Sequence, residues 1–301
     1  MTFDAVLIAG PTASGKSAAA LALAKRIGGI VINADSMQVY REAPILTAQP
    51  SQDDMAQVPH LLYGHVSARE VYSVGRWRED AIAALQKLDG RVPIFVGGTG
   101  MYFSALTDGL ADIPPTPLEI REAARALLDD IGVEALHARL TERDPLTAAR
   151  LRPSDPQRVL RAYEVFEATG RALVEWQNTP ADPVLKTDRI AAFVLDPPRT
   201  ELRALIAARF GKMVAEGGLQ EARTLEGLDP ALPAAKLLGL RPLQALAAGT
   251  LTEVEALDTA ITATRQFAKR QMTWFRHRMA HYIWFNPLSS NIITLYEQIS
   301  A

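Results

Sequence analysis

The residues of this chain with the clearest chemical role form a glycine-rich stretch, Gly10-Pro11-Thr12-Ala13-Ser14-Gly15-Lys16-Ser17. An apolar run precedes it and alanine-rich sequence follows it up to Ile27, which is the strand–loop–helix context of a phosphate-binding P-loop. In such a loop, backbone N–H groups surround a diphosphate and the N-terminus of the next helix adds a favourable dipole. We expect Lys16 to add positive charge and the Ser17 hydroxyl to be a ligand of Mg²⁺. The stretch therefore predicts that the chain binds a diphosphate.

A diphosphate site alone is compatible with three kinds of protein. The first is a kinase that moves the terminal phosphoryl group of a nucleotide. The second is a transferase for which the diphosphate is only the leaving group. The third is a nucleotide-switched interaction protein with little chemistry of its own, so other residues have to distinguish the three.

Two more predicted strands end in polar or glycine-rich residues. Ile30–Ala34 is followed by Asp35-Ser36-Met37-Gln38, and Val92–Val96 is followed by Gly97-Gly98-Thr99-Gly100. Ligands of parallel sheets bind beyond the carboxyl ends of the strands. Asp35 is therefore a candidate general base or Mg²⁺ contact, the alternative being a helix cap. Thr12 and Thr99 are candidates to contact substrate, the alternatives being a loop filler and a tight turn.

The pattern of elements predicts the fold class and its division. Apolar strand-like runs alternate with helical patterns up to about residue 112 and return at Ile190–Leu195, which indicates an α/β core with a P-loop NTPase-like parallel sheet covered by helices. Proline-rich Ile113–Pro117 opens a strand-poor helical stretch, and Asp155-Pro156 predicts a helix start near Gln157. We predict a core of residues 1–112 and 186–301, with a helical insertion subdomain of residues 113–185.

Composition restricts the class of protein. The 301-residue chain contains no cysteine, which excludes disulfides, Cys-ligated zinc and iron–sulfur clusters. The first residues carry no basic n-region of a signal peptide, and no apolar run approaches the ~20 residues that span a bilayer. We therefore expect a cytoplasmic protein.

Basic residues are unevenly distributed in a chain whose net charge is −2. Arg158 and Arg161 lie three positions apart, so they share one helix face, although paired surface arginines are the ordinary explanation. Arg265, Lys269 and Arg276 form one stripe at helical spacing, and residues 259–296 contain no carboxylate that could neutralise it. The absence of acidic partners favours an anionic partner such as a phosphate backbone. Trp274, Phe275 and Met279 are expected to offer apolar faces beside the stripe.

Five motifs in order resemble those of the bacterial tRNA dimethylallyltransferase (IPP transferase) family. They are Gly10-Pro-Thr-Ala-Ser-Gly-Lys-Ser17, Asn33-Ala-Asp35-Ser-Met-Gln-Val-Tyr40, Val96-Gly-Gly-Thr-Gly100 with Tyr102, Asp155-Pro-Gln-Arg158 with Arg161-Ala162, and Thr264-Arg-Gln-Phe-Ala-Lys-Arg-Gln-Met-Thr-Trp-Phe-Arg276. The resemblance runs from about residue 4 to residue 285.

The resemblance implies transfer of a dimethylallyl group from dimethylallyl diphosphate to N6 of the adenine beside the tRNA anticodon. It implies Mg²⁺ as cofactor, Asp35, Thr99 and Lys16 as catalytic residues, and an anticodon stem-loop gripped between core and insertion. The residues expected to contact tRNA are Asp35, Ser36, Met37, Gln38, Met101, Ala123, Gln157, Arg158, Val159, Leu160, Arg161, Arg265, Lys269 and Arg276. We expect a monomer that does not associate with membranes.

The chain departs from the family pattern at two places. Leu238-Gly239-Leu240-Arg241 stands where the family often has an aromatic residue after the glycine, and Leu205 stands where an arginine is common. Arg203 and Arg209 are both candidates to supply the missing charge.

The two other kinds of protein explain fewer of these residues. A kinase would not need a basic stripe that lacks acidic partners. An RNA-binding switch would give Asp35 and Thr99 no role.

Overall fold

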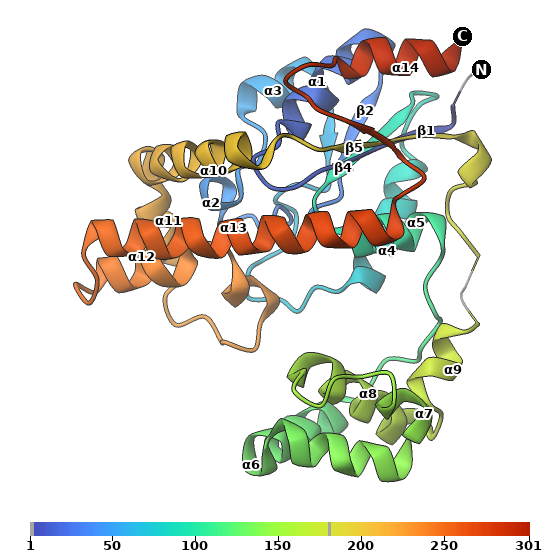
Figure 1. Ribbon diagram of the computed structural model, residues 1–301, viewed down its shortest axis with the longest axis vertical. Helices are drawn as coiled ribbons and strands as arrows, with labels where there is room; N and C mark the ends of the chain where they lie inside the picture. The colour runs from blue at the N-terminus through green and yellow to red at the C-terminus, as the bar shows by residue number, and fades with distance from the viewer. Residues whose placement is uncertain (1–2, 180–181) are drawn as a thin grey trace. The chain divides into compact units, whose positions relative to one another are not determined.

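The computed structural model describes residues 3–179 and 182–301 and contains a six-stranded parallel sheet (Figure 1). Its strands are β1 (Ala5–Ala9), β2 (Ile30–Asn33), β3 (His60–Leu61), β4 (Pro93–Gly97), β5 (Ile190–Leu195) and β6 (Ile283–Phe285). Their order is β3-β2-β4-β1-β5-β6, and every pairing is parallel. The predicted α/β class is confirmed. The sequence pattern missed β3 and β6, which are two and three residues long and too short for a visible period.

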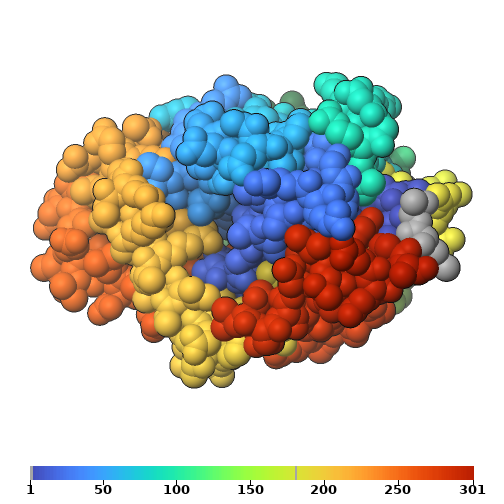
Figure 2. All heavy atoms as spheres, turned by 90° about the horizontal axis from the view of Figure 1, so that it is seen from above, coloured from blue at the N-terminus to red at the C-terminus, as the bar shows by residue number. Residues whose placement is uncertain are grey.

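One face of the sheet packs against the first and last helices. Alternate strand residues such as Val6 and Ile8 share an apolar cluster with α1 (Lys16–Ile27) and α14 (Ile292–Ser300), because successive strand residues point to opposite faces. Figure 2 shows the red C-terminal segment lying directly against the blue N-terminal region. The C-terminal helix therefore covers the element that carries the glycine-rich loop.

The opposite face is covered by α4 (Val74–Leu85) and α5 (Gly100–Thr107). Trp77 of α4 lies edge-on to Phe95 and stacks on Tyr102 of α5, with ring centroids 4.1 Å apart. Trp77 is fully buried, so its indole N–H needs a partner. It donates to the carbonyl of Asn33 at 2.9 Å, which ties this aromatic cluster to the carboxyl end of β2.

Further helices surround the sheet in the same unit. They are α2 (Pro44–Thr47), α3 (Gln52–Gln57), α10 (Arg199–Met213), α11 (Leu219–Thr224), α12 (Leu240–Ala247) and α13 (Glu253–Arg278), with a π-helical turn at Val214–Gly218 and 3₁₀ turns at Thr187–Arg189 and Pro233–Lys236. The longest of these, α13, begins with a capping box in which Thr252 and Glu255 satisfy each other's backbone N–H groups. Helix α10 packs against α13.

The chain divides into two compact units, Met1–Thr107 with Val184–Ala301 and Asp108–Pro183. The second unit contains α6 (Leu118–Arg143), α7 (Pro145–Ala148), α8 (Pro156–Thr169) and α9 (Leu173–Gln177). Its own apolar core includes Leu136, Leu140 and Val159. Asp155 caps α8 by accepting the N–H of Arg158 at 3.1 Å, as its position before Pro156 predicts. The unit begins upstream of the proline-rich segment at which we placed the boundary.

No helix in the described part of the chain is long and apolar enough to cross a membrane.

Candidate functional site

The strand order brings three of the predicted segments to one edge of the sheet. Because β4 lies between β2 and β1, the loop Gly97–Gly100 lies between Asp35 and the glycine-rich loop Gly10–Ser17. The N–H of Gly10 donates to the carbonyl of Gly97, and the N–H of Thr99 donates to the carbonyl of Ala34. The three segments are thus in direct contact at the carboxyl ends of their strands, where ligands of parallel sheets bind.

Lys16 is the central cation of this edge. It opens α1, is only 7% exposed, and its Nζ donates to the Pro11 carbonyl at 3.4 Å. Burial lowers the pKa of Lys16 to about 8, the negative charge of Asp35 opposes that shift, and the positive charge of Arg209 adds to it. A buried ammonium group with a lowered pKa gains most from an anionic ligand, since a nearby negative charge stabilises its protonated form.

The glycine-rich loop contains a buried polar group that makes no hydrogen bond to the described part of the chain. The Ser14 side chain is 3% exposed and its Oγ has no hydrogen-bond partner among those residues. A buried hydroxyl without a partner carries a desolvation cost of about 1–3 kcal/mol. An oxygen-rich ligand in the loop would remove that cost. The Ser17 hydroxyl lies exposed in the first turn of α1 and lines the same wide pocket as Ser14, about 850 Å³ in volume.

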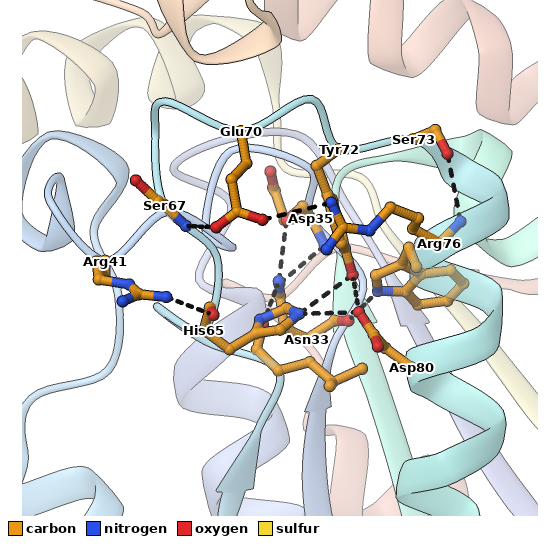
Figure 3. Close-up of polar contacts among 12 residues, drawn as sticks. Asn33, Asp35, Arg41, His65, Ser67, Glu70, Tyr72, Ser73, Arg76 and Asp80 are labelled. Atoms are coloured by element: carbon orange, nitrogen blue, oxygen red, sulfur yellow. Dashed lines mark hydrogen bonds and ion pairs between the residues drawn. The ribbon is translucent and has the colours of Figure 1, made fainter. Parts of the chain in front are cut away.

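Asp35 is held by hydrogen bonds from its own strand end. Its backbone N–H donates to Oδ1 of Asn33 at 2.8 Å, and Nδ2 of Asn33 donates to the Asp35 carbonyl at 3.0 Å. The Asp35 carboxylate accepts the N–H of Met37 at 3.0 Å. Figure 3 shows Asn33 beside Asp35, with Tyr72 and Asp80 in the polar cluster nearby. Asp35 is 7% exposed, so its carboxylate is both buried and fixed in direction.

Thr99 forms hydrogen bonds with Ser36, the residue that follows Asp35. Its Oγ1 accepts the Ser36 N–H at 2.8 Å and donates to Ser36 Oγ at 3.0 Å. Thr99 therefore fixes the backbone on the far side of Asp35. Gln38 is buried and its amide donates to the carbonyls of Thr47 and Ala48.

Arg209 is brought to the site by α10. With Lys16 and Asp35 it lines a cavity of about 30 Å³, whose apolar wall includes Leu46, Leu238 and Phe267. Burial lowers the pKa of Arg209 and the charge of Asp35 opposes that shift. Arg203, the other candidate to replace the family arginine, lines a different groove. Leu205 is exposed and lines the wide pocket.

The basic stripe of α13 lines a groove of about 670 Å³. Arg265, Lys269 and Arg276 are exposed, and among the described residues none of the three forms an ion pair. The N-terminal half of α10 supplies a second basic wall, with Arg199 and Arg203, which sequence reasoning missed. Leu202, Ile206 and Met272 are apolar lining residues of the groove, and Asp196 is its one acidic lining residue in the described ranges.

The aromatic side of this helix differs from expectation. Phe275 and Met279 are buried, at 0% and 2% exposure, so they belong to the core and offer no face beside the stripe. Trp274 packs over Gly100, where a Cβ would lie 2.1 Å from its ring. In this part of the helix the apolar residues Phe275 and Met279 therefore face inward, whereas the cations Lys269 and Arg276 are exposed.

The residues of the helical unit that we predict to contact tRNA differ in exposure and in their protein partners. Ala123 and Gln157 are exposed, as is Met101 in the other unit, whereas Val159 is fully buried and Leu160 partly so. Arg158 pairs with Asp155 at 3.5 Å. Arg161 donates to Thr116 Oγ1 at 3.1 Å and lies 3.8 Å from Glu164. Both arginines therefore have protein partners, which a nucleic acid would have to replace or share.

Two family models match this chain. The IPP transferase model matches residues 38–278 and the isopentenyl transferase model matches residues 3–64. The tRNA dimethylallyltransferase of Nitrobacter hamburgensis is 52% identical over 94% of this chain and 91% of its own length. That of Rhizobium meliloti is 48% identical over 92% of each chain.

Solved structures have the same architecture. The tRNA isopentenylpyrophosphate transferase of Bacillus halodurans superposes with a TM-score of 0.65 at 34% identity, covering 95% of this chain and 90% of that one. A eukaryotic dimethylallyltransferase acting on tRNA gives a TM-score of 0.74 at 28% identity, covering 90% of this chain and 69% of that one. The family model alone spans most of this chain. The chain therefore belongs to the IPP transferase family.

Proposed function

We propose that the chain transfers the dimethylallyl group of dimethylallyl diphosphate to N6 of the adenine on the 3′ side of the tRNA anticodon. The observation that carries this proposal is the cavity lined by Lys16, Asp35 and Arg209. It combines two cations for a leaving diphosphate with one carboxylate for an attacking amine. The names of the relatives, tRNA dimethylallyltransferases, agree with this chemistry.

In the proposed reaction, a bond forms between adenine N6 and C1 of the dimethylallyl group. The C1–O bond breaks and the diphosphate leaves with the electron pair. The proton of N6 passes to Asp35 and then to solvent, because an exocyclic amine whose lone pair is delocalised needs a base as the bond forms. Lys16, Arg209 and the N–H groups of the loop stabilise the negative charge on the leaving oxygen, a contribution of several kcal/mol in such sites.

We propose Ser17 as the protein ligand of Mg²⁺. Its hydroxyl is exposed in the first turn of α1, where it faces the same pocket as the loop, and Mg²⁺ prefers hard oxygen ligands shared with a phosphate. When bound, the ion would neutralise part of the leaving group's charge.

The cavity beside Asp35 has to enlarge before the dimethylallyl group of the donor can bind there. A volume of about 30 Å³ holds no more than one or two waters, so a five-carbon group needs additional space. Leu46, Leu238 and Phe267 form the apolar wall that has to shift. The target adenine must also leave the base stack, at a cost of a few kcal/mol, to reach a closed site.

Three incubations test the proposal. The protein is mixed with unmodified tRNA and dimethylallyl diphosphate, with tRNA and ATP, or with the donor alone, and nucleosides are analysed by mass spectrometry. We expect N6-dimethylallyladenosine only in the first mixture. Phosphorylated product with ATP would indicate a kinase, and RNA retention with slow hydrolysis but no modified base would indicate a nucleotide-dependent switch.

We expect the basic stripe to bind tRNA phosphates. Replacing Arg265, Lys269 and Arg276 together by glutamine should weaken tRNA binding and lower the salt slope of log K by roughly two units, since each phosphate contact contributes about 0.7–0.9. Donor affinity should not change. Binding is measured at three salt concentrations beside a melting curve.

A matched variant controls for net charge. Lys25, Lys87 and Arg91 are exposed cations outside the groove, and their triple glutamine variant should retain the wild-type salt slope. A wild-type slope in a folded stripe variant would remove the stripe from the RNA-binding surface.

Donor affinity should depend on pH through Lys16. The pKa of about 8 in the free protein has to rise when a diphosphate binds, because the anion favours the protonated lysine. Binding therefore takes up a proton, and affinity is constant from pH 7 to 7.5 and then falls by up to tenfold per pH unit above pH 8. Calorimetry in two buffers of different ionisation enthalpy measures the uptake.

The Lys16→Arg variant is the control for this pH dependence. Arginine stays charged throughout the range, so its donor affinity, whatever its size, should be flat from pH 7.5 to 9.5. A wild-type protein with equally flat affinity would contradict the role of Lys16.

A further inference from the structure

The side chain of Gln271 lies at the junction of the three site segments. Gln271 belongs to α13 and is only 5% exposed, on the buried side that also includes Ala268 and Phe275. A buried amide needs hydrogen-bond partners for both of its ends. Both partners of Gln271 are backbone atoms of the site.

Gln271 connects the glycine-rich loop to the loop after β4. Its Oε1 accepts the N–H of Thr12 at 2.9 Å, and its Nε2 donates to the carbonyl of Gly98 at 2.9 Å. Thr12 lies in the loop after β1 and Gly98 in the loop after β4, whereas Gln271 belongs to a helix 173 positions beyond Gly98. The amide therefore adds a side-chain connection between the two loops to the backbone hydrogen bond from Gly10 to Gly97.

The loop after β4 in turn supports Asp35. A Cβ on Gly98 would lie 2.1 Å from Nε2 of Gln271 and 3.0 Å from Oδ2 of Asp35. The Gly98 backbone is thus enclosed between the amide of Gln271 and the carboxylate of Asp35. Any shift of Gln271 transmits to the surface against which the Asp35 carboxylate rests.

We infer that Gln271 is a positioning residue that sets the distance between the diphosphate-binding loop and the carboxylate of Asp35. The inference rests on the proposed function, in which the loop holds the leaving group and Asp35 takes the proton of the attacking amine. These two groups act on opposite sides of the reacting carbon C1, one at the forming N6–C1 bond and one at the breaking C1–O bond, and a misplacement of about 1 Å can lower a rate by ~10²-fold. In this role Gln271 acts only through the backbone groups that it binds.

The Gln271→Met variant tests this inference, since methionine has a similar length and no amide. We expect the single-turnover rate at saturating donor and tRNA to fall by 10- to 100-fold, tRNA affinity to stay within twofold, and donor affinity to fall by less than tenfold. Gln298→Met is the matched control, because Gln298 is exposed on α14, and it should react at the wild-type rate.

A double-mutant cycle separates positioning from general loss of structure. If Gln271 acts through Gly98, the rates of Gln271→Met, Gly98→Ala and the double variant should be non-additive, with the double variant no slower than the slower single one. Additive losses, or a wild-type rate in a folded Gln271→Met protein, would overturn the inference. If the methionine variant does not fold, Gln271→Asn, whose shorter amide cannot reach both loops, replaces it in the cycle.

The outcomes distinguish this inference from the proposed function. Absence of prenyl transfer in the wild-type protein contradicts the function itself. Normal transfer in the wild type with an unaffected Gln271→Met variant contradicts only the positioning role.

Discussion

The Asp35→Asn variant should bind donor and tRNA within about fivefold of wild type while its single-turnover rate falls by ~10²–10⁴, the usual share of a general base. Asparagine keeps the local structure, because its Oδ1 can still accept the Met37 N–H that the carboxylate now accepts at 3.0 Å. It cannot take a proton from the adenine amine. Rapid-quench measurement of prenyl transfer at saturating substrates gives the rate.

The pH dependence of donor affinity is a second measurement, and it tests whether Asp35→Asn acts through the loss of negative charge. Asp35 opposes the lowering of the pKa of Lys16, so in the asparagine variant the fall of donor affinity with pH should begin below pH 8. The melting temperature serves as the control for folding. A transfer rate within threefold of wild type would show that another group takes the proton.

The fold could be predicted from the sequence wherever a pattern is local. The strands β1, β2, β4 and β5 are apolar runs bounded by turn residues, and Asp155-Pro156 is a helix start that depends only on neighbouring residues. The predicted P-loop lies between β1 and α1, as its flanking residues require. Short edge strands such as β3 carry no such pattern, because two residues cannot show a period.

Residues that enter the site from distant helices could not be assigned in the same way. Arg203 and Arg209 belong to the same helix, and the sequence does not distinguish them. In the folded chain Arg209 lines the cavity that contains Asp35, whereas Arg203 lines the basic groove. Gln271 belongs to a helix segment rich in basic residues, and no neighbouring residue in the sequence indicates that its side-chain amide is buried. The only signal was its place on the same side of α13 as Ala268 and Phe275.

The basic stripe shows what charge patterning can and cannot predict. The lack of carboxylates from 259 to 296 correctly indicated cations without acidic partners on α13, because helix faces normally balance charge by neighbouring pairs. For Arg158 and Arg161 the ordinary alternative, surface arginines paired with nearby carboxylates, is what the structure has, with Asp155 and Glu164 each three positions away. Charge patterning could not anticipate Arg199 and Arg203, since they join the stripe only through the packing of two helices.

The Lys16→Met variant should lose donor binding and gain stability. Removing an ionised contact to the diphosphate costs about 1.5–3 kcal/mol, which corresponds to a donor affinity roughly 10- to 100-fold weaker, and the rate should fall further because the leaving oxygen loses its counter-charge. Stability should rise because the buried ammonium is unfavourable in the folded protein, as its pKa of about 8 instead of 10.5 indicates. That penalty is at most about 3 kcal/mol near pH 7, from about 1.4 kcal/mol per unit.

The sign of this effect can be checked against pH. Since the folded pKa of Lys16 lies below the unfolded value, the wild-type penalty is complete below pH 8 and disappears as pH rises to 10.5. The stability advantage of Lys16→Met should therefore be largest at pH 7 and should vanish near pH 10.5, as measured by denaturant unfolding at both values. An unchanged donor affinity would contradict the role of the loop, and a destabilised variant at pH 7 would show that Lys16 contributes to folding through contacts other than its charge.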